Sequence, residues 1–309
     1  MIDSNGLYYQ AFDYLWNKRC VTLGLRSKAT YGVSGVLTTY RRGSGGMEKS
    51  RERKNLWTYC VFTYLLFWVL LMVTGLLIKL EAPVAVQEAM KNVCAWSPTF
   101  VLLILFRRLF PGTTLRGFLT SRLSGKMRFS DFAVSLAYQV GAMAVVVGLY
   151  VLLSGTSFGS LEFMAAADIV PIFLITLTSG PLGEELGWRG YVLGELMKRN
   201  SPFGASIKLG LIWGFWHIPL WLLTGFTGTD LLLYIGGFLV TILATSLLIT
   251  YFYQKSRNVF IAVWIHFWFN FLLRTVNIDL ITMVVYLSLA YFVFSIVLVV
   301  VKRDLLTKR

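Results

Sequence analysis

Long apolar runs separated by short polar segments dominate the chain. Eight such runs lie at 56–78, 92–106, 132–153, 169–183, 209–224, 231–253, 259–273 and 280–301. A transmembrane helix needs about 20 apolar residues to cross roughly 30 Å of hydrocarbon. Several runs reach that length, and we expect the shorter ones to extend into their polar flanks. The pattern predicts an all-α fold, a multi-pass transmembrane helical bundle of about eight spans.

The composition agrees with a membrane protein. Mean hydropathy is +0.66, 56% of the residues are hydrophobic and only 14% are charged, which is typical of the membrane class. A formal net charge of +14 would suggest nucleic-acid binding in a soluble protein. Here the basic residues lie between the apolar runs. We therefore interpret them as a topology signal and expect the lipid bilayer, and no nucleic acid, as a partner.

Basic and non-basic loops alternate along the chain. The loops at 107–131 and 254–258 carry Lys and Arg, as do the stretch "EKSRERK" and the C-terminal tail. The loops at 154–168 and 225–230 carry only acidic charges. By the positive-inside rule, both termini are predicted to be cytoplasmic, which agrees with an even number of spans. The sequence thus predicts an integral, multi-pass membrane protein.

The first 46 residues differ from the rest. They contain "LYYQAFDYLWNKR", which could form an amphipathic helix at the membrane surface, and end in "RRGSGG", which is typical of a flexible linker. We interpret residues 1–46 as a cytosolic N-terminal extension. It is either an appended segment, or the natural start is Met47, and the sequence leaves both open. Residues 47–309 form the predicted transmembrane domain.

Charged residues interrupt the apolar pattern in "GPLGEELGWRGYVL", residues 180–193. Ionisable groups inside a bilayer are costly, so they are a functional hypothesis by default. The preceding run is too short for a full crossing from the outer side, which places Glu184 and Glu185 in the inner half of the membrane. The alternative is a salt bridge in a cytoplasmic loop.

Helical spacing separates the roles of the two glutamates. Glu185 and Arg189 lie at i, i+4 and can pair on one helix face. Glu184 lies about 100° around the helix and has no such partner. We therefore expect Glu185 to be structural and Glu184 to be free for chemistry.

The two histidines of the chain, His217 and His266, each fall near the middle of an apolar run. Asn270 follows His266 at i+4, so both project from one face, and an uncompensated Asn is costly in lipid. This face is therefore predicted to line a polar cavity. Trp213 precedes His217 by one turn, and we expect it mainly to pack in the core. The candidate catalytic residues are Glu184, Glu185, Arg189, His217, His266 and Asn270.

These residue types can support hydrolysis at an intramembrane active site. A carboxylate beside a histidine can take a proton from water, and His and Asn N–H groups can stabilise an oxyanion. The sequence contains no HExxH motif. Glu184, His217 and His266 could supply three zinc ligands, but a His266–Asn270 oxyanion hole would leave too few. We prefer a mechanism that requires no cofactor, and zinc remains the alternative.

Three motifs in the second half of the chain resemble those of the CAAX-protease and bacteriocin-processing (CPBP, or Abi) family of intramembrane proteases. The family's EExxxR, FxxxH and HxxxN motifs correspond to "EELGWR", "WGFWH" and "HFWFN". The resemblance covers roughly 169–273, which we take as the catalytic core, and is to the prokaryotic type II CAAX prenyl endopeptidases of that family. Trp213 stands where the family prefers Phe.

The resemblance implies an intramembrane endopeptidase, of glutamate or metallo type, in a prokaryotic cell membrane. Its substrate would be a membrane-embedded or lipid-anchored peptide, with a prenylated CAAX-type protein as one form. Glu184 and His217 would activate water, and His266 and Asn270 would form the oxyanion hole. The second glutamate and the arginine of the first motif would orient the site. The site is expected to open toward the cytoplasmic leaflet, with substrate entering laterally between helices.

Two other classes of function stay open at this point. One is a non-enzymatic bacteriocin-immunity or membrane-scaffold protein on the same fold. The other is a proton-coupled transporter that uses the buried acids and histidines as a relay, although no inverted repeat is evident. The identity of the substrate and the oligomeric state do not follow from the sequence.

Overall fold

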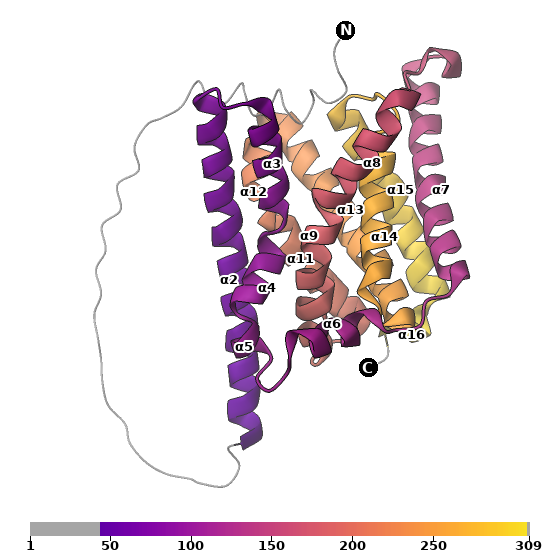
Figure 1. Cartoon of the computed structure of the whole chain (residues 1–309). Coiled ribbons are helices and arrows are strands. Elements are labelled where there is room, and N and C mark those ends of the chain that lie inside the picture. The colour runs from indigo at the N-terminus through magenta and orange to yellow at the C-terminus, as the bar shows by residue number, and fades with distance from the viewer. Residues whose placement is uncertain (1–43, 308–309) are drawn as a thin grey trace.

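The computed structural model describes residues 44–307, and this part of the chain is a bundle of helices without a named strand (Figure 1). The predicted all-α, multi-pass bundle is therefore confirmed. The predicted amphipathic helix near the N-terminus lies outside the described residues. The first described helix, α2, begins at Ser44, so it includes the end of the segment expected to be a linker.

Five helical segments within the described residues are long and apolar enough to cross a membrane. Four are the continuous helices α2 (Ser44–Lys79), α7 (Phe129–Ser154), α13 (Gly228–Ser256) and α15 (Leu280–Val301). The fifth, Ala166–Met197, is composite. It joins η2 (Ala166–Asp168), α8 (Ile169–Thr178), α9 (Pro181–Gly187), a π-helical turn at Trp188–Val192 and α10 (Leu193–Met197).

The other apolar runs form shorter helices, which end where the chain bends. They are α3 (Val84–Ala95), α4 (Ser97–Ile104), α11 (Pro202–Trp216), α12 (Ile218–Leu222) and α14 (Val259–Leu272). The connecting helices are α5 (Phe106–Leu109), α6 (Leu115–Leu123), η1 (Phe158–Ser160) and α16 (Arg303–Thr307). Each of the eight predicted runs is thus helical, but among the described residues five segments reach the length of a full span.

Helix α13 lies at the centre of the bundle. Half of its most apolar window is buried inside the protein, against 22–28% for the other four candidate spans. It packs against α11 on one side and α15 on the other. Gly210 and Gly214 on α11 allow the close approach, because a Cβ atom on either would lie 2.8 Å from a leucine side chain of α13. Small residues four apart are a common way to bring membrane helices together.

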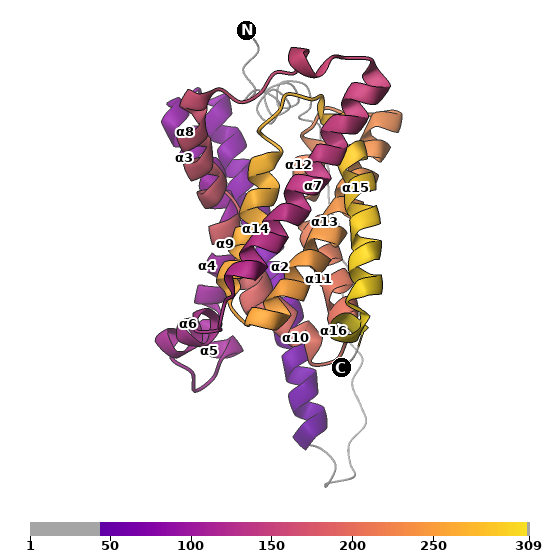
Figure 2. The same cartoon turned by 90° about the vertical axis from the view of Figure 1, so that its right-hand side faces the viewer.

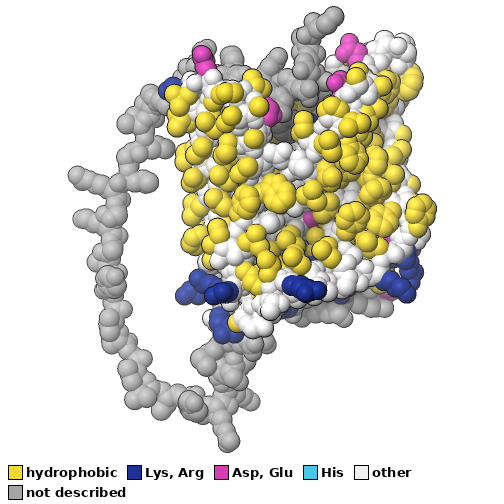
Figure 3. All heavy atoms as spheres, in the orientation of Figure 1, with side chains coloured by type: hydrophobic (Ala, Val, Ile, Leu, Met, Phe, Trp, Pro, Cys, Tyr) yellow, Lys and Arg dark blue, Asp and Glu magenta, His cyan; other side chains and the backbone are white. Residues whose placement is uncertain are grey.

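The two ends of the bundle carry opposite charge (Figure 3). The end that holds the start of α7 and helix α16 is rich in Lys and Arg, and we call it the basic end. Its connecting segments, 105–128, 198–201, 257–258 and 302–307, carry most of the loop cations. The opposite end carries Glu81, Glu162, Asp168, Asp230 and Asp279.

Polar contacts at the basic end fix the start of α14. Asn258 caps this helix by accepting a hydrogen bond from the Phe260 N–H at 2.9 Å. Its amide nitrogen also donates to the backbone carbonyls of Leu123 and Gly125, at 2.6 and 3.0 Å. The cap thus ties α14 to the segment that follows α6. Because α14 lies between α9 and α7 (Figure 2), this anchor sets the position of the polar residues along it.

At the opposite end, the segment before α8 is bound to the loop between α14 and α15. The Met164 N–H donates to the Thr275 carbonyl and the Asn277 N–H to the Glu162 carbonyl, each at 2.9 Å. The Asn277 amide also donates to the Glu162 carboxylate at 2.8 Å. These bonds hold the α14–α15 loop in place at this end of the bundle.

Candidate active site

Helix α9 carries both glutamates into the interior of the bundle. It follows a break at Ser179 and Gly180 and begins with Pro181, a residue suited to the first position of a helix. Glu184 is 4% exposed, and Glu185 and Arg189 are fully buried. Both acids lie past the midpoint of the composite span, nearer the basic end. The alternative of a salt bridge in a surface loop is therefore wrong.

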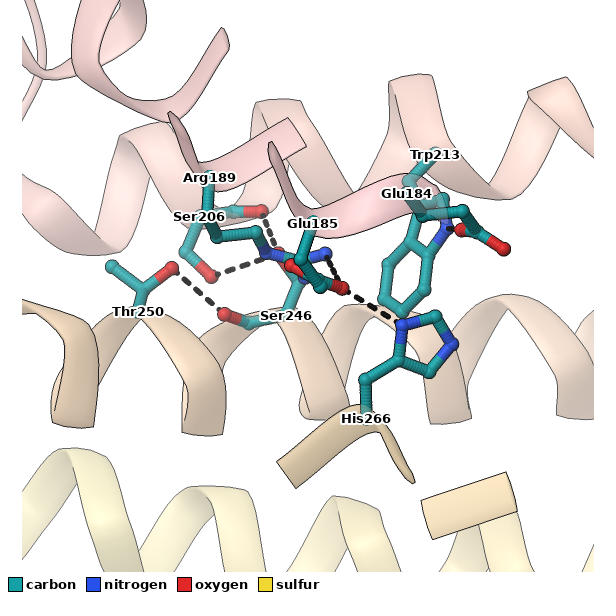
Figure 4. Close-up of polar contacts among 8 residues, drawn as sticks. All are labelled: Glu184, Glu185, Arg189, Ser206, Trp213, Ser246, Thr250 and His266. Carbon is teal, nitrogen blue, oxygen red and sulfur yellow. Dashed lines mark hydrogen bonds and ion pairs between the residues drawn. The ribbon is translucent and has the colours of Figure 1, made fainter. Parts of the chain in front are cut away.

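Glu185 connects two other candidate residues (Figure 4). Arg189 Nη1 donates to Glu185 Oε1 at 2.8 Å, the i, i+4 pair that the spacing predicts. His266 Nδ1, from α14, lies 2.8 Å from the same oxygen. Since a carboxylate oxygen accepts, Nδ1 carries the proton. Glu185 thus fixes the orientation of the imidazole and leaves its Nε2 facing away from the pair.

Glu184 has one fixed oxygen and one that faces a small open space. Trp213 Nε1, from α11, donates to Glu184 Oε2 at 2.6 Å. The other oxygen, Oε1, lies beside Gly180. A Cβ atom built on Gly180 would be 3.3 Å from Glu184 Oε1, 3.4 Å from Asn270 Nδ2 and 3.6 Å from His266 Nε2. Three polar atoms from two helices therefore converge on the hydrogen side of this glycine.

His217 lies at the end of α11, on the same cavity. Its Nδ1 is 2.8 Å from the Trp213 carbonyl. A carbonyl can only accept, so Nδ1 carries the hydrogen and Nε2 of the neutral ring can accept a proton. The ring packs edge-on against Trp216 and Phe238, with centroids 4.7 and 5.1 Å apart. Within residues 44–307 no hydrogen bond joins His217 to either glutamate.

A cavity of about 500 Å³ connects these side chains. Glu184, His217, His266 and Asn270 all contribute to its wall. The cavity continues toward the end opposite the basic end, where residues of α3 and of the α14–α15 loop line it. None of its lining residues belongs to a loop at the basic end.

The cavity therefore does not open at the basic end, which the charge pattern predicts to be cytoplasmic. The prediction of an opening on that side followed from the position of the glutamates along their span. That position does not determine which helices stay apart. Here residues of α3 and of the α14–α15 loop line the cavity beyond the site, whereas no residue of α10 lines it.

The donor set does not fit a three-ligand metal site. In the described part of the chain, no three side chains from His, Cys, Asp and Glu are grouped so that they could hold one metal ion. That includes the candidate set of Glu184, His217 and His266. We therefore route no step of the chemistry through a metal.

The sequence did not identify two residues of the site. Trp213 was expected mainly to pack in the core, yet its indole N–H binds Glu184. The sequence feature that could have indicated this role is the one departure from the family motif, Trp in place of Phe. Gly180 was not assigned a role at the site. The sequence feature that could have indicated one is its position directly before a helix-initiating proline.

The fold and site define a class: a membrane-spanning helical bundle with a buried carboxylate, two histidines and an asparagine on an internal cavity. Residues 165–272 match the family model of the Rce1-like type II CAAX prenyl endopeptidases, and this part of the chain is similar to that family. The match contains all six candidate residues.

The chain is also similar to a curated protein. The chain is 33% identical over 140 residues to CAAX prenyl protease 2 of Methanococcus maripaludis. The aligned part covers 41% of this chain and 51% of that protein. The chain thus spans about half the length of the curated relative that it matches.

Proposed function

We propose that this chain is an intramembrane endopeptidase, which hydrolyses a peptide bond of a membrane-anchored substrate inside the cavity. One observation carries the proposal: Glu184 Oε1, His266 Nε2 and Asn270 Nδ2 converge beside Gly180 in the interior of the bundle. A carboxylate and two N–H groups around one small space are what the attack of water on a carbonyl requires. The family match of residues 165–272 supports the same reaction.

Glu184 is the proposed base. Its Oε1 is directed to the open space, where a water between Glu184 and the substrate carbonyl would lose a proton as its oxygen attacks the carbonyl carbon. The same proton then passes to the leaving amine nitrogen as the C–N bond breaks. His217 is the second group for this transfer, because its Nε2 can accept a proton while Nδ1 is held by the Trp213 carbonyl.

His266 and Asn270 are the proposed oxyanion donors. Asn270 Nδ2 is a donor in any state. His266 donates from Nε2 only as an imidazolium, and the Glu185 carboxylate at 2.8 Å stabilises that cation. Arg189 in turn holds Glu185. Loss of one such donor typically lowers kcat by roughly 10²–10³.

A prenylated CAAX-type peptide is the substrate class we propose. The family description and the name of the archaeal relative both point to it. The cavity also has apolar walls, contributed by residues such as Phe67, Leu71, Phe269, Met283 and Leu287, which suit the burial of a hydrocarbon chain. The Glu–His chemistry proceeds without a metal in this proposal.

A peptide panel tests the proposed function. The purified chain in liposomes is given membrane-tethered peptides that end in CAAX sequences, with and without a prenyl group, and the products are identified by mass spectrometry. We expect the prenylated peptides to lose residues from the C-terminus, with equal turnover in the presence of a metal chelator. Absence of cleavage of every tethered peptide would contradict the proposal. Turnover that a chelator abolishes and zinc restores would replace the metal-free mechanism.

A further inference from the structure

Trp213 contacts four of the candidate residues, and three of these, Glu184, Arg189 and His266, are drawn in Figure 4. Its indole N–H donates to Glu184 Oε2 at 2.6 Å. Its ring lies under the guanidinium of Arg189, with 4.3 Å between Cζ and the ring centroid, and meets the ring of His266 edge-on at 5.0 Å. Its carbonyl oxygen receives the Nδ1–H of His217 at 2.8 Å. No other described aromatic residue has contacts of this kind with both Glu184 and Arg189.

The contact with Glu184 depends on the type of residue at this position. The indole N–H is a donor only, whereas phenylalanine, the residue that the family motif prefers here, has no donor. A Phe ring would fill much of the same space and still face Arg189. It would leave Glu184 Oε2 without its partner. The hydrogen bond is therefore a property of this chain rather than of the motif.

We propose that Trp213 is a positioning residue for Glu184. This inference rests on the proposed role of Glu184 as the base. The indole N–H holds Oε2, so that Oε1 points at the space beside Gly180, and it stabilises the ionised carboxylate. A hydrogen bond donated to an ionised group is stronger than one between neutral groups, and a carboxylate that is 4% exposed depends on such partners.

The ring face of Trp213 also stabilises the guanidinium of Arg189. Arg189 is fully buried, and only its Nη1 has a hydrogen-bond partner among the described side chains, since Nε and Nη2 have none. A guanidinium over an indole ring is a favourable cation–π arrangement. Trp213 therefore supports both the pair that orients His266 and the base itself.

The ionisation of Glu184 is set by the groups around it. On its own composite span these are Glu185 and Arg189. His266 faces it from α14, and His217 lines the same cavity from α11. From α3, Glu88 and Lys91 line the far part of the cavity and pair with one another. Substituting Trp213 removes one donor and leaves all of these charges in place.

The test is the pH dependence of kcat/KM in Trp213→Phe. The base must be ionised, so activity falls as pH is lowered through its titration. Without the indole donor the carboxylate binds a proton at higher pH. We therefore expect the acid limb to move up by about one pH unit, the size of one charge-assisted hydrogen bond. At pH values below the acid limb, kcat/KM of the variant should be about tenfold lower than that of the wild type. At higher pH the difference should be smaller.

A matched control is Trp221→Phe. Trp221 is also buried, 5% exposed, and its indole N–H has no hydrogen-bond partner in the described part of the chain. It does not line the cavity. This variant loses the same atoms and should keep the wild-type pH profile. If Trp213→Phe also keeps the wild-type acid limb and its rate falls by one constant factor, Trp213 only packs and the proposal is wrong.

A second measurement detects the hydrogen bond between Trp213 and Glu184 by NMR and does not require enzymatic activity. In protein labelled with ¹⁵N at the indole nitrogens, one N–H resonance should move on Glu184→Gln and should titrate in the wild type. If no indole N–H resonance responds to Glu184, the inference fails, even if Trp213→Phe does not fold. An inactive wild-type protein that shows this resonance would retain the hydrogen bond and contradict the proposed function instead.

Discussion

At the scale of single residues, the site depends on a glycine, because a larger side chain at position 180 would fill the space between the polar atoms. Gly180 lies where Glu184 Oε1, Asn270 Nδ2 and His266 Nε2 come together, and only a hydrogen atom occupies the point between them. In the proposed reaction, a water and a substrate carbonyl need that space. Gly180 therefore contributes to the site through the volume that it leaves open.

Gly180→Ala should reduce activity with little effect on stability. The added methyl group would lie 3.3–3.6 Å from the three polar atoms, at the limit of contact, and would fill the space for the water. We expect kcat/KM to fall by at least about tenfold, since displacement of reacting groups by about 1 Å can cost roughly 10²-fold. Peptide cleavage and thermal unfolding in detergent measure the two effects.

The control for this substitution is Gly194→Ala. Gly194 lies in α10 of the same composite span, and a Cβ atom there would have no neighbour within 4 Å. Alanine is the better helix former by up to about 1 kcal/mol. The control should keep full activity and unfold at the same or a slightly higher temperature. Equal activity of the Gly180→Ala variant would mean that the space beside Gly180 is not where the reaction occurs.

Helical spacing predicted part of this site. The i, i+4 rule gave the Glu185–Arg189 pair and separated Glu184 from it, and both features are present. The convergence of His266 and Asn270 on Glu184, and the Trp213 hydrogen bond, depend on how α9, α11 and α14 pack. Spacing along one chain contains no information about the distance between helices, so these contacts could not be derived.

At the scale of helices, α11 holds Trp213 and His217 against the site because it packs closely on α13. The approach is closest at Gly210, where a Cβ atom would be 2.8 Å from the Leu243 side chain and 3.2 Å from its Cα. A backbone atom at that distance cannot be displaced by a rotamer change. The interface between these two helices therefore sets the position of two site residues.

Gly210→Leu should separate α11 from α13 and lower both stability and activity. Overpacking of a close contact costs typically about 1–3 kcal/mol, and the shift of α11 would move Trp213 and His217. Thermal unfolding in detergent and peptide cleavage test this expectation. Gly236→Leu is the control, because Gly236 on α13 is exposed and a Cβ atom there meets nothing within 4 Å. If both variants are equally stable, the α11–α13 contact does not hold the site.

Hydropathy predicted where the helices are but not how each one crosses. All eight runs are helical, yet several are divided, as at Trp96 between α3 and α4 and at His217 between α11 and α12. The break at Ser179–Gly180 and the π-helical turn after Gly187 lie inside one span. An average over an apolar window cannot detect these interruptions.

At the scale of the whole molecule, the basic side chains and the open part of the cavity lie toward opposite ends of the bundle. The cations gather at the basic end (Figure 3), and the cavity extends toward the other end. If the positive-inside rule holds, the basic end is cytoplasmic. The cavity would then be reached from the extracytoplasmic side of the membrane.

Cysteine labelling tests this orientation. In a chain with Cys20, Cys60 and Cys94 replaced by alanine, Leu280→Cys places a thiol on the cavity wall and Ser124→Cys places one at the basic end. A membrane-impermeant maleimide added to intact cells should label position 280 and should reach position 124 only after permeabilisation. The reverse pattern would place the cavity on the cytoplasmic side.

The central claim is that Glu184 activates the water. The most direct measurement is the cleavage of a membrane-tethered, prenylated peptide by Glu184→Gln, a change that keeps the shape of the side chain and removes the base. Glu195→Gln is the control, because Glu195 lies on the same span, outside the cavity, and pairs with Lys198 at 2.8 Å. We predict wild-type cleavage by the control and none by folded Glu184→Gln. Undiminished cleavage by Glu184→Gln would contradict the account.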